Sequence, residues 1–366
     1  MKFEIDRNDF FPALAQVGGA VEKRHTLPIL ANLLLKTSSH ALEIVGSDLE
    51  VQIGAHAVAN ISDEGAVTVP ARKLFDICRN LPEDAKISFS QKGDRATLTS
   101  GRGRFSLSTL PAADYPTMDQ PVADIRISIP QGDLKSLLDK VGFAMANQDV
   151  RYYLNGLLIE IGEDRIRCVA TDGHRLAKAD KHLEQGVGEI HSAIIPHKTV
   201  VEVKRLLNNS ESLVDVSLTE KALSLIFGDT RVVSKLIDGK YPDYQRVIPR
   251  GLDQRAFVLK DDLRRALIRT SVLSNEKYRG VQFSFEEGLL RLLAHNPEQE
   301  EAVEEVALDY AGVKVAMGFN VTYVLDVLNA LDDDAVEILF AEDGKSSIWK
   351  NVDKEEESFV IMPMRL

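Results

Sequence analysis

The sequence has 366 residues, of which 44% are hydrophobic and 27% are charged, a composition typical of globular proteins rather than disordered or fibrous chains. Its 56 Asp and Glu outnumber its 44 Lys and Arg, and the net charge of −12 excludes a protein that binds nucleic acid over its whole outer surface, though not one with a local basic lining. No apolar run is long enough for a membrane-spanning helix, and Cys78 and Cys168 have no CxxC spacing, so neither a disulfide framework nor a cysteine metal site is expected.

In chain order, the first predicted elements are a strand and a helix. Apolar residues alternate over positions 1–5, which predicts a strand rather than a signal peptide, and then recur at helical spacing from 10 to 17. Two paired strands near 33–35 and 42–44 follow, then a second helix that ends near 81 and further alternating strands near 105–107.

The same order of elements returns twice, at a period of 124 residues. The strand at 32–35 (NLLL) returns at 156–159 (GLLI) and at 280–283 (GVQF), and the turn at 46–48 (GSD) returns at 170–172 (ATD) and at 294–296 (AHN). A unit of this length is a domain rather than a solenoid repeat. The sequence therefore predicts an α+β protein of three similar domains, each with two helices and antiparallel sheets.

Proline and glycine interrupt the periodicity near 119–121 and again near 249–251, which indicates the domain boundaries. We expect the three repeats at 1–122, 126–246 and 247–366, and call them repeats one, two and three.

No catalytic motif stands out. The most enzyme-like string is Asp172-Gly173-His174-Arg175, but Asp-Gly between alternating runs is first of all a hairpin turn, and its counterparts in the other repeats differ. Gly101-Arg102-Gly103 joins two strands and opens no helix, so it is not a dinucleotide fingerprint, and the histidines lack zinc-ligand spacing. We expect a non-enzymatic protein without metal or cofactor. The alternatives are an enzyme that uses Asp172, His174 and Arg175, which turnover would reveal, and a repeat scaffold that binds only proteins.

Seven distinctive strings are spread over the whole chain. They are TLPIL (26–30), SLSTLPAAD (106–114), QDVRYYLNG (148–156), ATDGHRL (170–176), SNEK (274–277), NPEQEEA (296–302) and the terminal MPMRL (362–366). Together they resemble the bacterial DNA sliding clamps, the family of the beta subunit of DNA polymerase III. The resemblance implies a head-to-tail homodimer that closes into a ring around duplex DNA. It also implies a processivity factor that tethers the replicative polymerase and other replication and repair proteins through a hydrophobic peptide-binding pocket.

The number of predicted helices is compatible with such a ring. Six helices packed about 10 Å apart around a hole leave only about 9 Å of clear space, too little for a duplex roughly 20 Å across. Twelve helices leave about 28 Å, so two chains are the minimum.

Basic residues on predicted helices could face the DNA. Alone, such residues are more often a solvated helix face, but in an acidic ring they would line the bore and contact phosphates without reading sequence. They are Arg72, Lys73, Lys198, Lys204 and Arg205. The resemblance adds Arg24, Gln148, Tyr152 and Tyr153 as DNA contacts, the tyrosines as stacking surfaces for single-stranded template.

The expected dimer interface joins repeat one of one chain to repeat three of the other. Basic residues gather on the last hairpin of repeat one and acidic residues crowd one segment of repeat three, which suits a head-to-tail contact, although solvation within each chain is the simpler reading of both. The predicted interface comprises Arg95, Arg102, Arg104, Phe105, Leu107, Val272, Leu273, Glu298, Glu300, Glu301 and Glu304.

The chain ends in a segment too apolar for a free tail. Alternation of Val360, Met362 and Met364 predicts a final core strand, but Pro363 fits only an edge strand or a strand end, and methionines suit an adaptable binding surface. By resemblance this tail belongs to the pocket that binds short partner peptides, with Tyr278 where the family often has Phe. The implied pocket residues are Leu154, Thr171, Gly173, His174, Arg175, Leu176, Pro242, Arg246, Val247, Tyr278, Asn320, Tyr323, Val360, Met362, Pro363, Met364 and Arg365.

The partners implied are therefore a second copy of the chain and duplex DNA without sequence specificity. The pocket would bind the DNA polymerase III alpha subunit, the clamp-loader delta subunit, other DNA polymerases and mismatch-repair proteins. Sparse cysteines indicate a reducing cytoplasm, where the protein would associate with the nucleoid and not with a membrane.

Overall fold

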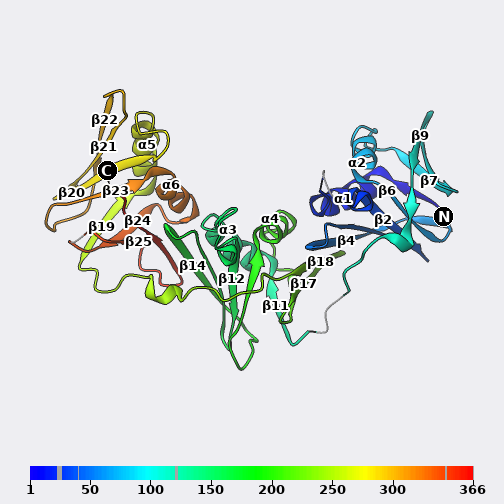
Figure 1. The fold of residues 1–366 in the computed structure, drawn as a ribbon, viewed down its shortest axis with the longest axis horizontal. Helices are drawn as coiled ribbons and strands as arrows, with labels where there is room; N and C mark the ends of the chain where they lie inside the picture. Colours follow the sequence, from blue (N-terminus) through cyan, green and yellow to red (C-terminus); the bar gives the residue numbers. More distant parts are fainter. Residues whose placement is uncertain (23–26, 40, 120–122, 343, 366) are drawn as a thin grey trace. The chain divides into compact units, whose positions relative to one another are not determined.

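A computed structural model describes residues 1–22, 27–39, 41–119, 123–342 and 344–365 (Figure 1). By packing, the chain forms two compact units. Unit 1 holds Met1–Gly132 and Val201–Leu236, and unit 2 holds Asp133–Val200 and Ile237–Leu366. Repeat two is thus shared between the units.

Each repeat contributes two α-helices, as the periodicity predicts. They are α1 (Arg7–Val17) and α2 (Ala71–Arg79), α3 (Gln131–Gly142) and α4 (His197–Leu206), and α5 (Lys260–Ser271) and α6 (Val321–Ala330). Their apolar faces are buried, as at Leu74 and Cys78 of α2, where the basic Arg72, Lys73 and Arg79 are exposed.

Strands make up most of the rest of each repeat. Repeat one has β1 (Lys2–Asp6), β2 (Asn32–Ser38), β3 (Ala41–Ser47), β4 (Val51–Val58), β5 (Asn60–Asp63), β6 (Gly65–Pro70), β7 (Lys86–Lys92), β8 (Arg95–Ser100), β9 (Gly103–Ser108) and β10 (Leu110–Pro111). Repeat two has β11 (Ile125–Pro130), β12 (Gly156–Ile161), β13 (Arg165–Thr171), β14 (Arg175–His182), β15 (His191–Pro196), β16 (Leu213–Leu218), β17 (Ala222–Phe227) and β18 (Thr230–Lys235). Repeat three has β19 (Gln254–Leu259), β20 (Gly280–Glu286), β21 (Leu289–His295), β22 (Glu301–Ala307), β23 (Val315–Asn320), β24 (Ala335–Phe340), β25 (Ser347–Asn351) and β26 (Glu357–Ile361).

The sheets of unit 1 cross the boundary between repeats. A nine-stranded sheet runs β10-β6-β2-β3-β4-β18-β17-β16-β11, and a five-stranded sheet runs β5-β1-β7-β8-β9. Antiparallel pairing of β4 with β18, in the register Ala55↔Thr230 to Val51↔Ser234, joins repeat one to repeat two. In the five-stranded sheet β9 is an edge strand.

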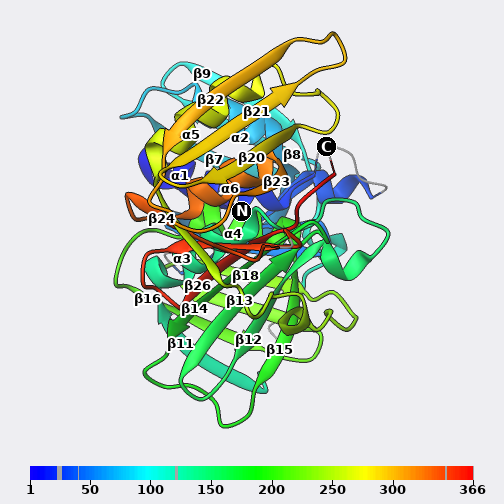
Figure 2. The ribbon, with the colours of Figure 1, turned by 90° about the vertical axis from the view of Figure 1, so that its left-hand side faces the viewer.

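Unit 2 is built in the same way. Its eight-stranded sheet runs β15-β12-β13-β14-β26-β25-β24-β19, and its four-stranded sheet runs β22-β21-β20-β23, with β22 at one edge. Antiparallel pairing of β14 with β26, from Arg175↔Ile361 to Ala179↔Glu357, joins repeat two to repeat three, and Figure 2 shows the two strands side by side. We call the β4–β18 and β14–β26 pairings the repeat seams.

Aromatic rings fill the core of repeat three. Phe283, Phe319 and Trp349 are fully buried and meet edge to face, with ring centroids 5.1 to 6.2 Å apart. The two cysteines are free and buried, and burial raises the pKa of Cys78 to about 12, so its thiol stays protonated. None of the described helices is long and apolar enough to cross a membrane.

Candidate functional site

An apolar cluster in unit 2 brings together several of the predicted pocket residues. Its buried members are Ala146, Leu154, Leu158, Val169, Leu176, Ile194, Tyr241, Tyr244 and Val360, and the half-buried Tyr153, Ile237, Val247, Ile248 and Ile348 pack against them. Four of these were expected from the sequence: Leu154, Leu176, Val247 and Val360. Tyr241 and Tyr244 were missed, although the return of Tyr115-Pro116 as Tyr241-Pro242 signalled Tyr241.

The turn between β13 and β14 forms one end of this cluster. One carboxylate oxygen of Asp172 accepts hydrogen bonds from the amides of His174 and Arg175, at 2.9 and 3.0 Å. Gly173 has φ of 89°, a conformation that favours glycine, and its amide donates to the Thr171 hydroxyl. The interpretation of Asp-Gly as a hairpin turn is confirmed. The Asp172 carboxylate therefore stabilises the turn, through the backbone amides and through Nε of Arg175.

Arg175 holds the turn to repeat three. Its guanidinium bonds the carboxylates of Asp172 and Asp326 and donates to the Phe143 carbonyl at 2.7 Å. The group also lies over the Phe143 and Tyr323 rings, 5.2 and 4.5 Å from their centroids. Only 11% of the side chain is exposed, so Arg175 acts as a positioning residue. His174 is exposed and stacks on Tyr323 with centroids 6.3 Å apart.

The C-terminal tail runs past the same turn. Strand β26 ends at Ile361, before Pro363, as the sequence predicts for a strand end. Beyond it the amide of Met362 donates to the His174 carbonyl at 3.0 Å and that of Met364 to the Gly318 carbonyl at 2.8 Å. The tail therefore connects the eight-stranded sheet to β23 while Met362 stays 37% exposed.

The remaining predicted pocket residues lie at the start of α6 and on a short 3-10 helix. Asn320 caps α6 by accepting a hydrogen bond from Thr322, and donates to the Tyr278 carbonyl. Pro242 precedes the 3-10 helix Tyr244–Arg246, on which Arg246 is exposed and paired with Asp243 at 2.8 Å.

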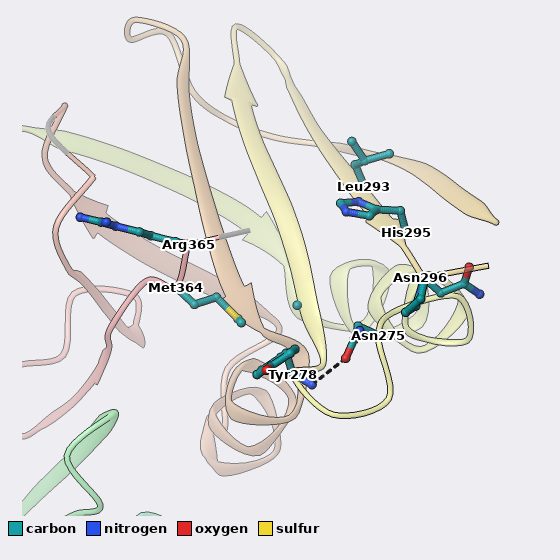
Figure 3. A pocket seen from close by; sticks show the side chains of 9 residues that line it. Asn275, Tyr278, Leu293, His295, Asn296, Met364 and Arg365 are labelled. Carbon is teal, nitrogen blue, oxygen red and sulfur yellow. Dashed lines mark hydrogen bonds between the residues drawn. The ribbon is translucent and has the colours of Figure 1, made fainter. Parts of the chain in front are cut away.

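Tyr278 lies in a separate hollow, which we call the repeat-three pocket (Figure 3). Its volume is about 370 Å³. The lining residues are Asn275, Tyr278, Gly280, Leu293, His295, Asn296, Pro297, Met364 and Arg365. The tail thus contributes Met362 beside the β13–β14 turn and Met364 to this second hollow.

The basic residues predicted on the helices differ in whether they are exposed or bonded to another part of the chain. Arg72 and Lys73 of α2 are exposed, and Arg72 lies 3.8 Å from Asp76. In contrast, Arg205 of α4 pairs with Glu202 and donates to the carbonyls of Ala15 and Gln16 at the end of α1, at 3.0 and 2.7 Å. Arg205 therefore stabilises a helix end in unit 1. Lys198 and Lys204 are half-buried on α4, and Arg24 lies outside the described residues.

The loop with the predicted DNA-contacting tyrosines has its own polar network. Arg151 bonds the Asp149 carboxylate through Nε and Nη2, at 3.0 and 2.8 Å, and also donates to the Asp172 carbonyl. The Asn155 side chain bonds both backbone groups of Asp149. Tyr152, 57% exposed, meets Tyr153 edge to face at 5.7 Å. Arg151, which the sequence reading missed, thus links this loop to the β13–β14 turn.

The hydrogen bonds between Asp149 and Arg151 should persist at low pH. Hydrogen bonds from Arg151 lower the pKa of Asp149 from 3.8 to about 2. The stabilisation should be complete above pH 3.8 and be lost as the pH falls through about 2, because only the ionised carboxylate is paired. An NMR titration of the Asp149 carboxyl carbon checks this, with Arg151→Gln as the comparison. A midpoint near 3.8 in the unchanged protein would contradict it.

The predicted interface residues lie on two sheet edges. Arg102 and Arg104 are exposed at β9, whereas Leu107 is already buried in its own sheet. On the other edge, Glu304 of β22 forms two hydrogen bonds with Arg269 of α5, both 2.7 Å, so its charge is balanced within the chain. The exposed acidic residues of that segment are Glu298, Glu300, Glu301 and Glu305. Val272 is 76% exposed beside the half-buried Leu273.

Among the described residues, no group of three His, Cys, Asp or Glu side chains is placed to hold a metal ion. The described residues form an apolar cluster with the C-terminal tail beside it, helices with basic residues, and two sheets with the edge strands β9 and β22. These features suit binding rather than catalysis.

Comparisons with known proteins match the chain from end to end. Family descriptions of the N-terminal, central and C-terminal domains of the DNA polymerase III beta subunit match residues 1–119, 128–243 and 245–365. Beta sliding clamps from Proteus mirabilis and Pseudomonas aeruginosa are 46% and 42% identical, with 100% of each chain covered. A crystal structure of the DNA polymerase III beta subunit from Pseudomonas aeruginosa bound to griselimycin matches with a TM-score of 0.97 at 42% identity, over 100% of both chains.

Proposed function

Because this chain belongs to the family of DNA polymerase III beta subunits, the bacterial DNA sliding clamps, we propose that two copies join head to tail into a ring that holds the replicative polymerase on duplex DNA. The chain is a processivity factor and is not catalytic itself. The observation that carries this function is the match to sliding clamps over the whole chain, in sequence and in fold. We further propose repeat boundaries at 1–122, 126–246 and 247–366.

The ring closes through the edges of β9 and β22. Both are edge strands with unpaired backbone groups, and strand addition at such an edge is a common way to extend a sheet. The exposed Arg102 and Arg104 on one edge complement Glu298, Glu300 and Glu301 on the other. Val272 and Leu273 supply the apolar part of this contact.

The bore contacts DNA through phosphates. Arg72 and Lys73 are exposed on α2, and Lys198 and Lys204 add positive charge on α4. Gln148, Tyr152 and Tyr153 contact the template on one face of the ring, and Arg24 adds a further charge. Loose contacts of this kind favour sliding, because closure rather than affinity keeps the DNA inside.

Partner proteins dock on the apolar cluster beside the tail. A relative with 42% identity binds the peptide-like inhibitor griselimycin, which fits recognition of a short apolar peptide. The exposed Met362 and half-buried Val247 would receive its Leu or Phe side chains. The partners are the polymerase III alpha subunit, the loader delta subunit, other DNA polymerases and mismatch-repair proteins, which compete for two sites per ring in the cytoplasm at the nucleoid.

A topological experiment tests this function. Protein loaded on a nicked circle should remain through a wash in moderate salt, whereas cutting the circle should release it, because phosphate contacts weaken with salt but a closed ring does not. Retention is measured by gel filtration of DNA-bound protein before and after the cut. Equal loss from circular and linear DNA would rule out encirclement.

A further inference from the structure

Unit 1 contains a hollow that the function proposed above does not use. Its volume is about 400 Å³, and we call it the unit-1 hollow. It is lined by α1, by the end of β4, by the residues at the end of α4 and by the turn between β17 and β18. All of these segments belong to unit 1, so the hollow lies beside the β4–β18 seam within one compact body.

The corresponding place in unit 2 holds two lysines. Beside the β14–β26 seam, the Lys181 ammonium group lies 3.0 Å from the Asp133 carboxylate. The Lys140 ammonium group lies 2.7 Å from the Asp332 carboxylate and 2.6 Å from that of Glu357. Both ammonium groups are therefore bound by carboxylates of their own chain.

One of these ion pairs has lost its cation in unit 1. Asp9 stands 124 residues before Asp133, and Ala57 stands 124 residues before Lys181. Both Asp9 and Ala57 line the unit-1 hollow, and the Asp9 carboxylate has no partner among the residues that the structure describes. The hollow thus keeps a carboxylate at the place where unit 2 binds an ammonium group.

The second lysine is also replaced in unit 1. Gln16 stands 124 residues before Lys140, and its Oε1 accepts a hydrogen bond from the Thr230 hydroxyl at 3.2 Å. The strand registers of the two seams place Thr230 on β18 where β26 has Glu357. A neutral hydrogen bond therefore replaces the ion pair and brings no positive charge to the hollow.

The charge that lines the unit-1 hollow is negative. Asp9 and Asp229 contribute carboxylates, and no Lys or Arg is found among the described residues that line it. Of those residues, His56 is the only other titratable one, and its Nδ1 lies 3.4 Å from the Asp229 carbonyl. A lining of this kind favours a cationic ligand.

A buried amide adds a hydrogen-bond donor to the same hollow. Gln131 is only 7% exposed. Its Oε1 accepts from the Asn208 amide at 3.2 Å, whereas its Nε2 has no acceptor among the described residues. A buried donor of this kind favours a ligand that brings a carbonyl oxygen. Pro12 and Phe227 add an apolar wall that suits the methylene stem of a lysine.

We propose that the unit-1 hollow binds a lysine side chain that a partner protein presents on an extended segment. The ammonium group pairs with Asp9 and Asp229, as that of Lys181 pairs with Asp133 in unit 2. A backbone carbonyl of the segment accepts a hydrogen bond from Nε2 of Gln131. A free alkylamine brings the charge but no carbonyl, so a peptide fits the hollow better.

An NMR titration of the full-length protein tests this proposal. The probe is the blocked tripeptide acetyl-Ala-Lys-Ala-amide, and the signals are those of the alanine methyl groups, of which Ala13 and Ala57 line the hollow. Asp9→Asn and Asp229→Asn each remove one charge and keep the shape of the side chain. Asp84→Asn is the matched control, because Asp84 is exposed in unit 1 but does not line the hollow.

We expect saturable shifts of the Ala13 and Ala57 methyl signals in the unchanged protein and in Asp84→Asn. Asp9→Asn and Asp229→Asn should each bind about two- to fivefold more weakly, as expected for the loss of one exposed ion pair. A peptide with norleucine in place of the lysine should give no shift, and n-butylamine should bind more weakly than the lysine peptide.

Three results would overturn the proposal. Absence of any shift, or equal binding of the norleucine peptide, would show that the hollow does not recognise lysine. Unchanged affinity in both Asp9→Asn and Asp229→Asn would place the peptide elsewhere. Binding of n-butylamine as tight as that of the peptide would show that a free amine, and not a protein segment, is the ligand.

A further variant fills the hollow from within the chain. Ala57→Lys repeats the arrangement of Lys181 and Asp133, so the introduced ammonium group should pair with Asp9 and exclude the peptide. The Ala13 methyl signal should then no longer respond to the probe. An undiminished response of Ala13 in folded Ala57→Lys would also overturn the site.

Discussion

Val272→Asp should convert the ring into folded monomers that cannot stay on DNA. Val272 is 76% exposed at the end of α5, so a charge there does not disturb the core of its own chain. In the ring it would be buried without a partner, at a cost of at least about 2 kcal/mol per interface. For two interfaces this is about a thousandfold weaker association. Light scattering at sub-micromolar concentration and retention on a nicked circle measure the two effects.

The matched control is Val58→Asp. Val58 is 79% exposed and lies on β4, which pairs with β3 and β18 and not with an edge strand. It should stay dimeric and loadable, which separates interface loss from the general effect of a surface charge. Leu273→Asp should behave like Val272→Asp. If the Val272→Asp protein remained fully dimeric, Val272 would not lie in the dimer interface.

Truncation after Ile361 should leave a folded dimer that no longer binds the partner peptide in repeat two. Phe359, Val360 and Ile361 are fully buried in β26 and remain, so the repeat seam survives. The loss removes Met362, which lies beside the β13–β14 turn and can contribute about 1.5 to 3 kcal/mol when buried against a ligand. We expect affinity to fall at least about 10-fold, measured by calorimetry.

Arg365→Ala provides the comparison for the truncation. Arg365 is exposed, and its replacement keeps Met362, Met364 and their hydrogen bonds to His174 and Gly318. Its affinity at the repeat-two site should change only slightly. Unreduced binding by the truncated protein would exclude the tail from that site.

Local features of this protein follow well from its sequence. Six helices, the β8–β9 hairpin, the β13–β14 turn and the end of the last strand before Pro363 all appear as predicted. Each depends on a short-range signal, such as helical spacing, an Asp-Gly pair or the missing amide of proline. The three-domain organisation followed from the 124-residue period, which is visible when segments of the same chain are compared with one another.

Long-range roles could not be predicted in the same way. Arg205 looked like part of a basic face, yet it bonds carbonyls at the end of α1, about 190 residues earlier. Arg175 was expected in the peptide pocket by resemblance, but its contacts with Phe143, Tyr323 and Asp326 could not be predicted. Long, flexible basic side chains reach partners that only the tertiary structure identifies. The repeat seams escaped prediction for the same reason, because any alternating strand could pair with many others.

The outer sheets of repeats one and three indicate where the ring would open. Repeat one leaves a five-stranded sheet with β9 at its edge and repeat three a four-stranded sheet with β22 at its edge, so their union would make nine strands, like the sheet across the β4–β18 seam. A closed dimer would then contain six like joints, four of them backed by a continuous chain and two held by non-covalent contact alone. The ring would therefore open at one of these two non-covalent joints. If a short linker fused two copies into one polypeptide, one of the joints would become covalent, and DNA would have to enter through the other.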